Sequence, residues 1–326
     1  MWIKALYNKM VRLNDNMKKR NVIVTLADRK YLPQAKQLFS SVYLNGGWDG
    51  EYLLLAHEIP KKELEWFEKK GIIVRKCRRI SYTTPQKGSI ISMSKLYLFT
   101  PYFKRWKRVI FFDSDIMVRG SLEYLKNVAG FNAVRDISPS SFNFVESKDR
   151  KYIRQYTEIK NKYRRVPFFN SGVMVFETKI IKKGMFRLLK EKYEKNYQYI
   201  YGDQAVLNME FSDRWQELPT VFNIFETGVT TTNVFKKNRT AILKKDILSP
   251  VVHFCGTYMP WDKRNRFYGE WMDNLKKSEN IKRFDSSVHK ETITNWKVRS
   301  RMIKSAYNLY RVSTAISGIK KRFYKV

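Results

Sequence analysis

The chain has 326 residues, and its 64 lysines and arginines outnumber its 30 acidic residues, giving a net charge of +34. Hydrophobic residues make up 43% and aromatic residues 15%, so the chain can bury a sizeable core, which excludes global disorder. Such a charge favours anionic partners: nucleic acid, anionic lipid or phosphorylated substrates.

Two cysteines, Cys77 and Cys255, exclude a disulfide framework and favour a reducing compartment. No apolar run reaches the roughly 18 residues that a membrane-spanning helix needs. The basic N-terminus lacks the continuous apolar core of a signal peptide. We therefore predict a cytoplasmic protein that is soluble or lies on the inner face of a membrane.

The first half of the chain alternates between strand-like and helix-like segments. Residues 1–20 have apolar side chains at helical spacing between basic ones, which predicts a basic amphipathic extension. Beyond it we predict strands at 22–27, 52–56, 72–74 and 109–112, and helices at 33–44, 61–70 and 92–99. This order predicts an α/β, Rossmann-like fold with a mixed, mainly parallel central sheet flanked by helices.

The second half continues this pattern and ends in a basic tail. We predict strands at 131–135, 173–177 and 251–254, and helices at 182–197 and 203–211. Residues 138–167 form a long basic connection, which is typical of a lid or binding loop. We expect one domain at 21–275. The tail, 276–326, has no acidic residue after Glu291 and interleaves aromatic with basic side chains, as an interfacial helix does.

Near the middle of the chain, a buried strand runs directly into two aspartates. Residues 109–112 are continuously apolar, as in a strand buried on both faces. Asp113 and Asp115 follow at its carboxyl end, where open α/β sheets bind ligands. Side chains at positions i and i+2 of an extended chain share one face, so both carboxylates can bind one hard cation. The alternative is a turn or a helix cap.

Three further polar segments follow in the chain: Phe169-Asn170-Ser171-Gly172, Tyr201-Gly202-Asp203-Gln204, and His253-Phe254-Cys255-Gly256-Thr257-Tyr258-Met259-Pro260-Trp261. Together with the two aspartates, these segments have an order and spacing that resemble those of the motifs in the family-eight retaining glycosyltransferases. That family includes glycogenin and the bacterial lipopolysaccharide glucosyl- and galactosyltransferases. The resemblance covers roughly residues 21–270.

The resemblance implies a GT-A domain that transfers glucose or galactose from a UDP-sugar, retaining the anomeric configuration, with Mn²⁺ or Mg²⁺ as cofactor. It places Asp113, Asp115 and His253 on the metal-binding positions. It also places Asn170, Asp203 and Gln204 on catalytic positions that face the transferred sugar and the acceptor. The donor-binding residues that we infer with it are Thr25, Ala27, Asp28, Tyr31, Lys95, Asp113, Ser114, Asp115, Gly256 and Lys263.

One position departs from the family pattern. The last motif generally carries a lysine on the diphosphate, and Met259 stands there in this chain. A methionine cannot neutralise phosphate, so either Lys263 or Arg264 makes this contact or donor binding is weaker. We expect the acceptor to be a glycan or a lipid-linked molecule, and the basic loop 138–167 favours an anionic one.

Each of these residues also has a purely structural alternative. His253 would then be a core histidine with satisfied hydrogen bonds, and Asp203 a helix cap. For Cys255 we predict a small core residue rather than a nucleophile. Two other functions compete with sugar transfer. One is nucleic-acid binding, which the charge favours although no recognition motif accompanies it. The other is a catalytically degenerate module that still binds a nucleotide-sugar.

Overall fold

In the computed structural model, residues 20–81, 89–136, 140–146, 149–226 and 250–285 are described. Seven strands form the main sheet, in the order β3-β2-β1-β4-β7-β6-β8. Strands β3, β2, β1 and β4 are mutually parallel, whereas β7 runs antiparallel to both β4 and β6. The strands are β1 (Asn21–Ala27), β2 (Glu51–His57), β3 (Ile73–Cys77), β4 (Arg108–Phe112), β6 (Phe131–Arg135), β7 (Phe169–Glu177) and β8 (Trp215–Glu217).

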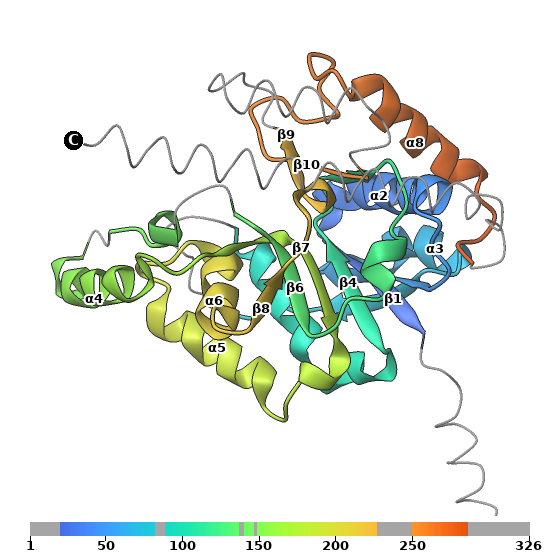
Figure 1. Cartoon of the computed structure of the whole chain (residues 1–326). Coiled ribbons are helices and arrows are strands. Elements are labelled where there is room, and N and C mark those ends of the chain that lie inside the picture. The colour runs from blue at the N-terminus through green and yellow to red at the C-terminus, as the bar shows by residue number, and fades with distance from the viewer. Residues whose placement is uncertain (1–19, 82–88, 137–139, 147–148, 227–249, 286–326) are drawn as a thin grey trace, which may run out of the picture.

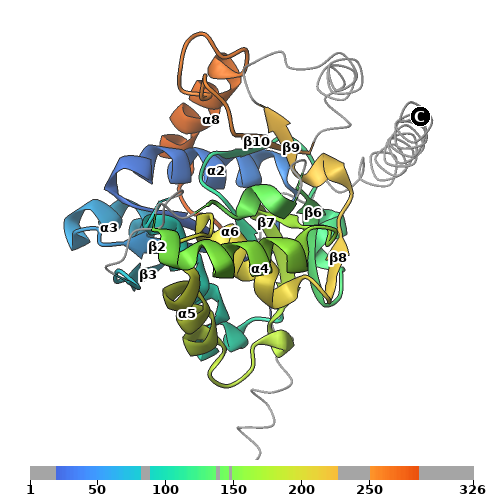
Figure 2. The same ribbon diagram turned by 90° about the vertical axis from the view of Figure 1, so that its left-hand side faces the viewer.

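Alternating side chains of the central strands face two separate hydrophobic cores. On β4, Ile110 and Phe112 belong to one core, and Val109 and Phe111 belong to the other. Helices α2 and α8 cover the first face, while α5 and α6 cover the second (Figures 1 and 2). Because both faces are covered, the apolar run of β4 is fully buried, as its sequence predicts. The prediction of a mixed, mainly parallel sheet flanked by helices is confirmed.

A second, three-stranded sheet lies beyond the carboxyl end of β4. It has the order β5-β10-β9, with β5 antiparallel to β10 and β9 parallel to it. Its strands are β5 (Ile116–Val118), β9 (Ile224–Glu226) and β10 (Val251–Phe254). The pairing sets His253 opposite Ile116, one residue after Asp115. This small sheet therefore joins the last motif of the sequence to the aspartate pair.

The helices complete the layers around the sheets. The α-helices are α2 (Leu32–Asn45), α3 (Lys61–Lys69), α4 (Ile153–Tyr163), α5 (Met185–Asn196), α6 (Gly202–Phe211) and α8 (Tyr268–Asn280). Short 3₁₀ helices join them: η1 (Arg29–Tyr31), η2 (Ile91–Phe99), η3 (Pro101–Arg105), η4 (Glu123–Lys126), η5 (Ser140–Asn143), η6 (Arg150–Tyr152), η7 (Thr178–Ile180) and η8 (Thr220–Phe222). Among the described helices, none is both long and apolar enough to span a bilayer.

Two sequence predictions differ from the structure. The connection at 138–167 is not a structureless loop, because α4 forms inside it. Tyr152, Tyr156, Ile159 and Tyr163 recur at helical spacing and pack against the second core. The helix predicted at 92–99 is the 3₁₀ helix η2, whose buried apolar side chains belong to the second core.

The predicted domain ends lie partly outside the described residues. The boundary placed at residue 275 falls within α8, and Phe284 beyond it still packs in the first core. The amphipathic extension, except for Arg20, and the tail from residue 286 are outside the described residues. The predictions of basic helical termini therefore stay predictions.

Candidate active site

Side chains from the ends of three neighbouring central strands meet at one place. β1 and β4 run parallel and have their carboxyl ends there, while the antiparallel β7 begins there. With residues of α6 and β10, they line a cavity of about 400 Å³. Of the predicted site residues, the cavity is lined by Ala27, Asp28, Tyr31, Lys95, Asp113, Ser114, Asp115, Asn170, Asp203, Gln204 and His253.

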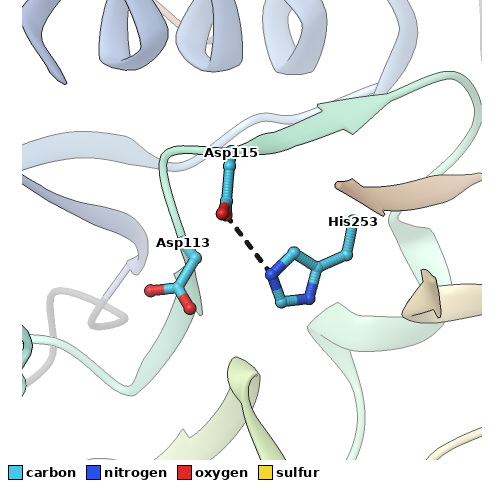
Figure 3. A group of neighbouring side chains, drawn as sticks. All are labelled: Asp113, Asp115 and His253. Atoms are coloured by element: carbon cyan, nitrogen blue, oxygen red, sulfur yellow. Dashed lines mark ion pairs between the residues drawn. The ribbon is translucent and has the colours of Figure 1, made fainter. Parts of the chain in front are cut away.

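At the centre of this cavity, two carboxylates and an imidazole come together. Asp113 follows β4, Asp115 precedes β5, and His253 lies on β10. One ligand atom from each lies within 4.8 Å of the others. Figure 3 shows the Asp115 carboxylate facing the imidazole, with 3.3 Å between Asp115 Oδ1 and His253 Nε2. The structure thus brings together the three residues that the resemblance places on metal-binding positions.

The electrostatics of this group fit a divalent cation. Burial raises the pKa of Asp113, with Lys95 opposing and Asp115 adding to the rise. Burial disfavours a charged imidazole, but Cys255 and Asp115 outweigh it and raise the pKa of His253 well above its ordinary value. Asp115 Oδ1 is buried, and the imidazole Nε2 of His253 lies 3.3 Å from it. Crowded negative charge beside an imidazole is the mixed oxygen and nitrogen donor set that Mn²⁺ accepts.

The imidazole of His253 lies directly against the backbone of β7. A Cβ atom added to Gly172 would lie 2.3 Å from His253 Cε1 and 2.8 Å from its Nδ1. No side chain fits at such separations, so glycine is required for this close approach. The backbone of Gly172 also accepts a hydrogen bond of 2.8 Å from the N–H of Asp113. Gly172 therefore sets the position of two members of the group.

Lys95 connects the aspartate pair to α6. Its side chain is 5% exposed, and its Nζ lies 2.9 Å from Asp113 Oδ1 and 3.0 Å from Asp203 Oδ2. Ser171 Oγ also donates to Asp203, at 2.8 Å. Burial alone would lower the pKa of Lys95, but the two carboxylates outweigh it and raise the pKa above its ordinary value. Lys95 is therefore a permanently charged link between Asp113 and Asp203.

The two predicted catalytic amides belong to a polar network at the start of β7. Asn170 Nδ2 donates to Gln204 Oε1 at 3.0 Å. Gln204 Nε2 in turn donates to Asp136 at 2.8 Å and to Asn143 at 2.9 Å. Asp203 lies in the first turn of α6, whose N-cap is Tyr201. Asp136 and Asn143 could not be recognised from the sequence, because each is an isolated polar residue outside the motifs.

Asp28 and Tyr31 form the wall of the cavity beyond β1. Asp28 caps η1 by accepting hydrogen bonds from the N–H groups of Lys30 and Tyr31, at 3.0 and 3.1 Å. The Tyr31 ring is 38% exposed and meets Trp261 edge-on, with 6.2 Å between centroids. Burial, with Asp115 nearby, raises the pKa of the Tyr31 hydroxyl. An exposed ring beside a capped turn is a surface on which a planar base can stack.

Three predicted donor-binding residues, Thr25, Gly256 and Lys263, do not line this cavity. Thr25 is fully buried within β1, and Lys263 is exposed beyond β10. Their proposed contacts with a donor stay predictions.

Met259 stands where the resemblance expects a lysine, and the structure shows what surrounds it. Met259 packs against the first core. Arg264 lies over the Tyr258 ring at 4.2 Å and pairs with Asp262 at 2.6 Å.

The prediction that Cys255 is a small core residue is wrong, since it is exposed just after the end of β10.

Comparison with known proteins points to one family. The sequence model of glycosyl transferase family 8 matches residues 22–265. Glycosyltransferase GlyB of Streptococcus pneumoniae is 30% identical over 207 residues, which are 59% of this chain and 46% of GlyB. Glycosyltransferase GlyF of the same organism is 23% identical over 255 residues, which are 74% of this chain and 58% of GlyF. The alignments thus span about half the length of each relative.

Solved structures share the fold. The galactosyltransferase LgtC in complex with donor and acceptor sugar analogs has a TM-score of 0.57 at 18% identity, covering 85% of this chain and 99% of LgtC. The apo structure of the bifunctional glycosyltransferase WbbM has a TM-score of 0.58 at 18% identity, covering 82% of this chain and 52% of WbbM. The predicted GT-A-like class is therefore confirmed.

Proposed function

The chain belongs to glycosyl transferase family 8, and from this premise we propose that it transfers a hexose, glucose or galactose, from a UDP-sugar to a glycan or lipid-linked acceptor. We propose that transfer retains the anomeric configuration and depends on Mn²⁺ or Mg²⁺. One observation carries the proposal: Asp113, Asp115 and His253 are disposed to hold a divalent cation in the cavity that Asp203 and Gln204 also line.

The residues around the cavity suit the charges that develop during transfer. A divalent cation held by Asp113, Asp115 and His253 would act as a Lewis acid on the diphosphate leaving group. Lys95 keeps the Asp203 carboxylate in place through its 3.0 Å ion pair. Asp203 and the carboxamide of Gln204 then stabilise positive charge on the sugar ring. Such preorganised electrostatic stabilisation is commonly the largest catalytic contribution.

We propose a front-face route for the chemical step. The acceptor hydroxyl attacks the anomeric carbon from the side that the diphosphate leaves. The new glycosidic bond forms as the bond to phosphate breaks, and the hydroxyl proton passes to a phosphate oxygen. This route needs no covalent adduct on the enzyme. Trapping a glycosyl adduct on Asp203 would contradict it.

The α4 arm, defined as residues 149–165, supports an anionic acceptor. It carries seven basic and two acidic side chains, and α4 projects from one end of the molecule (Figure 1). The inner face of α4 is tied to the cavity wall: the Tyr163 ring stacks on Phe144 at 5.7 Å, and Phe144 pairs with Ile200. Tyr201, which follows Ile200, is 44% exposed and lines the cavity. An acceptor that reaches past Tyr201 would therefore meet positive charge.

The basic tail supports a further proposal, that the enzyme lies on the cytoplasmic face of an anionic membrane. Residues 292–326 contain basic and aromatic side chains without acidic ones. Each basic residue near an anionic leaflet contributes about 1 kcal/mol to binding. Within this proposal, residues 21–275 form the catalytic domain, while 1–20 and 276–326 form basic extensions. Co-sedimentation with anionic but not neutral vesicles tests it.

Release of UDP from UDP-glucose and UDP-galactose is the direct test of the proposed activity. We expect turnover with Mn²⁺ and an acceptor, and none after chelation with EDTA. A thermal-shift screen of UDP-sugars identifies the donor, because a ligand that binds only the folded state raises its stability. Absence of turnover with every UDP-sugar and acceptor would contradict the proposal.

Met259 favours one second candidate, a catalytically degenerate module. The family lysine that contacts the diphosphate is replaced here, and Arg264 is paired with Asp262 instead. Calorimetry separates the two functions. Binding of UDP and Mn²⁺ without hydrolysis or transfer would support the degenerate module, whereas turnover would exclude it.

A further inference from the structure

The hydrogen bonds behind the cavity form one continuous chain of amides, anchored by backbone N–H groups. The N–H of Ser171 can only donate, and it lies 3.1 Å from Gln204 Oε1. This fixes which atom of the Gln204 amide is the oxygen, and Asn170 must therefore present its Nδ2 to the same oxygen, at 3.0 Å. The carbonyl Oδ1 of Asn170 accordingly faces the N–H of Gly172, at 2.9 Å. Two backbone donors thus determine the orientation of both amides.

The chain continues from Asn170 to His253 through Asn223. Asn223 is fully buried beside η8. Its Nδ2 donates to Asn170 Oδ1 at 2.9 Å, so its own Oδ1 must point the other way. That oxygen lies 3.0 Å from His253 Nδ1. Because an amide oxygen only accepts, Nδ1 of the imidazole has to carry a proton.

We infer that Asn223 is a positioning residue that holds the Nδ1–H of His253 and so leaves Nε2, on the side of Asp115, as the ring nitrogen available to a cation. The inference rests on the proposed function, since it concerns the histidine assigned to the metal. The partner of the second ring nitrogen commonly sets the tautomer and orientation of a metal-binding histidine. Asn223 plays that part here, and the ring lies against the backbone at Gly172.

The same chain runs from His253 through Asn223 and Asn170 to Gln204. Beyond Gln204 it reaches Asp136, a carboxylate that only accepts, at 2.8 Å from Gln204 Nε2. Its two ends are therefore chemically unlike, with an acceptor at Asp136 and a required donor at His253. No amide between them can reverse without leaving a buried polar group unpaired, which is costly. The hydrogen bonds of the whole network together therefore fix the orientation of the imidazole.

Nitrogen-15 NMR of the histidine side chains tests the inference without any metal. The chain contains only three histidines, so the spectrum is simple, and His253→Gln identifies the signal. Because the pKa of His253 is raised, the metal-free wild-type protein is measured at a pH at which the ring is neutral, and there we expect its single proton on Nδ1. A neutral ring protonated only on Nε2 would overturn the inference, whether or not the protein transfers sugar.

Metal affinity supplies the second readout. In the Asn223→Leu variant the acceptor is lost, and we expect Mn²⁺ affinity, measured by electron paramagnetic resonance, to fall about 10- to 100-fold. Asn223→Asp keeps an acceptor for Nδ1–H but loses the donor to Asn170 Oδ1, so its affinity should fall less than that of Asn223→Leu. Equal affinity in wild type and Asn223→Leu, or equal losses in both variants, would contradict the inference.

Asn132 provides a matched control. It is also a buried asparagine, 4% exposed on β6, and it donates to the carbonyl of Ala129 away from the cavity. Asn132→Leu should lower the thermal stability of the protein while leaving Mn²⁺ affinity and the His253 spectrum unchanged. If no cation binds even to wild-type protein, the proposed function fails, whereas the NMR result still decides the role of Asn223.

Discussion

Asp113, Asp115, His253 and Lys95, called the cation end of the cavity below, differ from the α4 arm in how deeply their side chains are buried. Asp113 follows a fully buried strand, the Lys95 side chain is 5% exposed, and the imidazole of His253 lies against the backbone of β7. On the α4 arm, in contrast, Arg164 and Arg165 are exposed. We propose that the two regions have separate tasks. In this proposal the buried charges serve the reaction, and the exposed charges contact the acceptor.

Removing one carboxylate of the cation end gives the largest expected effect. Asp115→Asn keeps the shape of the side chain but removes its charge. We expect transfer to fall about 10³-fold or more, because Lewis-acid stabilisation of a leaving group contributes several kcal/mol. UDP release assays measure this loss, and circular dichroism checks that the variant is folded. Transfer within tenfold of wild type would show that Asp115 holds no essential cation.

The buried charge of Lys95 should matter for stability as well as activity. Lys95→Met leaves Asp113 and Asp203 without their shared cation, and breaking a buried pair costs about 3–5 kcal/mol. Lys36→Met is the control, since Lys36 pairs with Glu279 at the surface, where an ion pair contributes about 1 kcal/mol or less. Urea denaturation gives both free energies of unfolding. Similar losses in the two variants would remove the distinction between buried and exposed charge.

A single methyl group tests the close approach of His253. In Gly172→Ala the new Cβ would lie 2.3 Å from the imidazole, so the ring must move. We expect Mn²⁺ affinity to fall about 10- to 100-fold, as when an outer partner of a metal ligand is lost. In Gly269→Ala on α8 the added Cβ meets nothing within 4 Å, and stability should rise by about 0.5–1 kcal/mol. Unchanged affinity in Gly172→Ala would mean that His253 is not fixed by this contact.

The α4 arm should give the smallest effect, confined to the acceptor. We expect the double variant Arg164→Ser/Arg165→Ser to raise KM for a phosphate-bearing acceptor about fivefold to tenfold, since each exposed ion pair contributes up to about 1 kcal/mol. KM for the UDP-sugar should not change. Lys61→Ser/Lys62→Ser removes two exposed charges of α3 and is the matched control. An equal shift in both double variants would indicate only a general effect of net charge.

The cation end could be largely predicted from the sequence, because its residues are adjacent to strong local patterns. The apolar run before Asp113 predicts a buried strand, and the polar segments at Asn170 and Asp203 stand at element boundaries. Asn223 could not be predicted in this way. It is a single amide whose role appears only when η8, β7 and β10 come together in the fold.

The α4 arm was less predictable for a different reason. Its charge suggested a loop, although Tyr152, Tyr156, Ile159 and Tyr163 already have the spacing of a buried helix face. That spacing was the available signal, and the high density of basic residues masked it. Charge shows which partners a surface attracts, whereas the period of the apolar residues shows what the backbone does.

The central claim is that Asp113, Asp115 and His253 together hold the cation that binds the donor diphosphate. Anomalous diffraction at the manganese edge, from crystals grown with Mn²⁺ and UDP, tests it most directly. We expect one manganese peak bonded to all three side chains and to phosphate oxygens of UDP. UDP bound in the cavity with no manganese peak, or a peak that His253 does not contact, would contradict it.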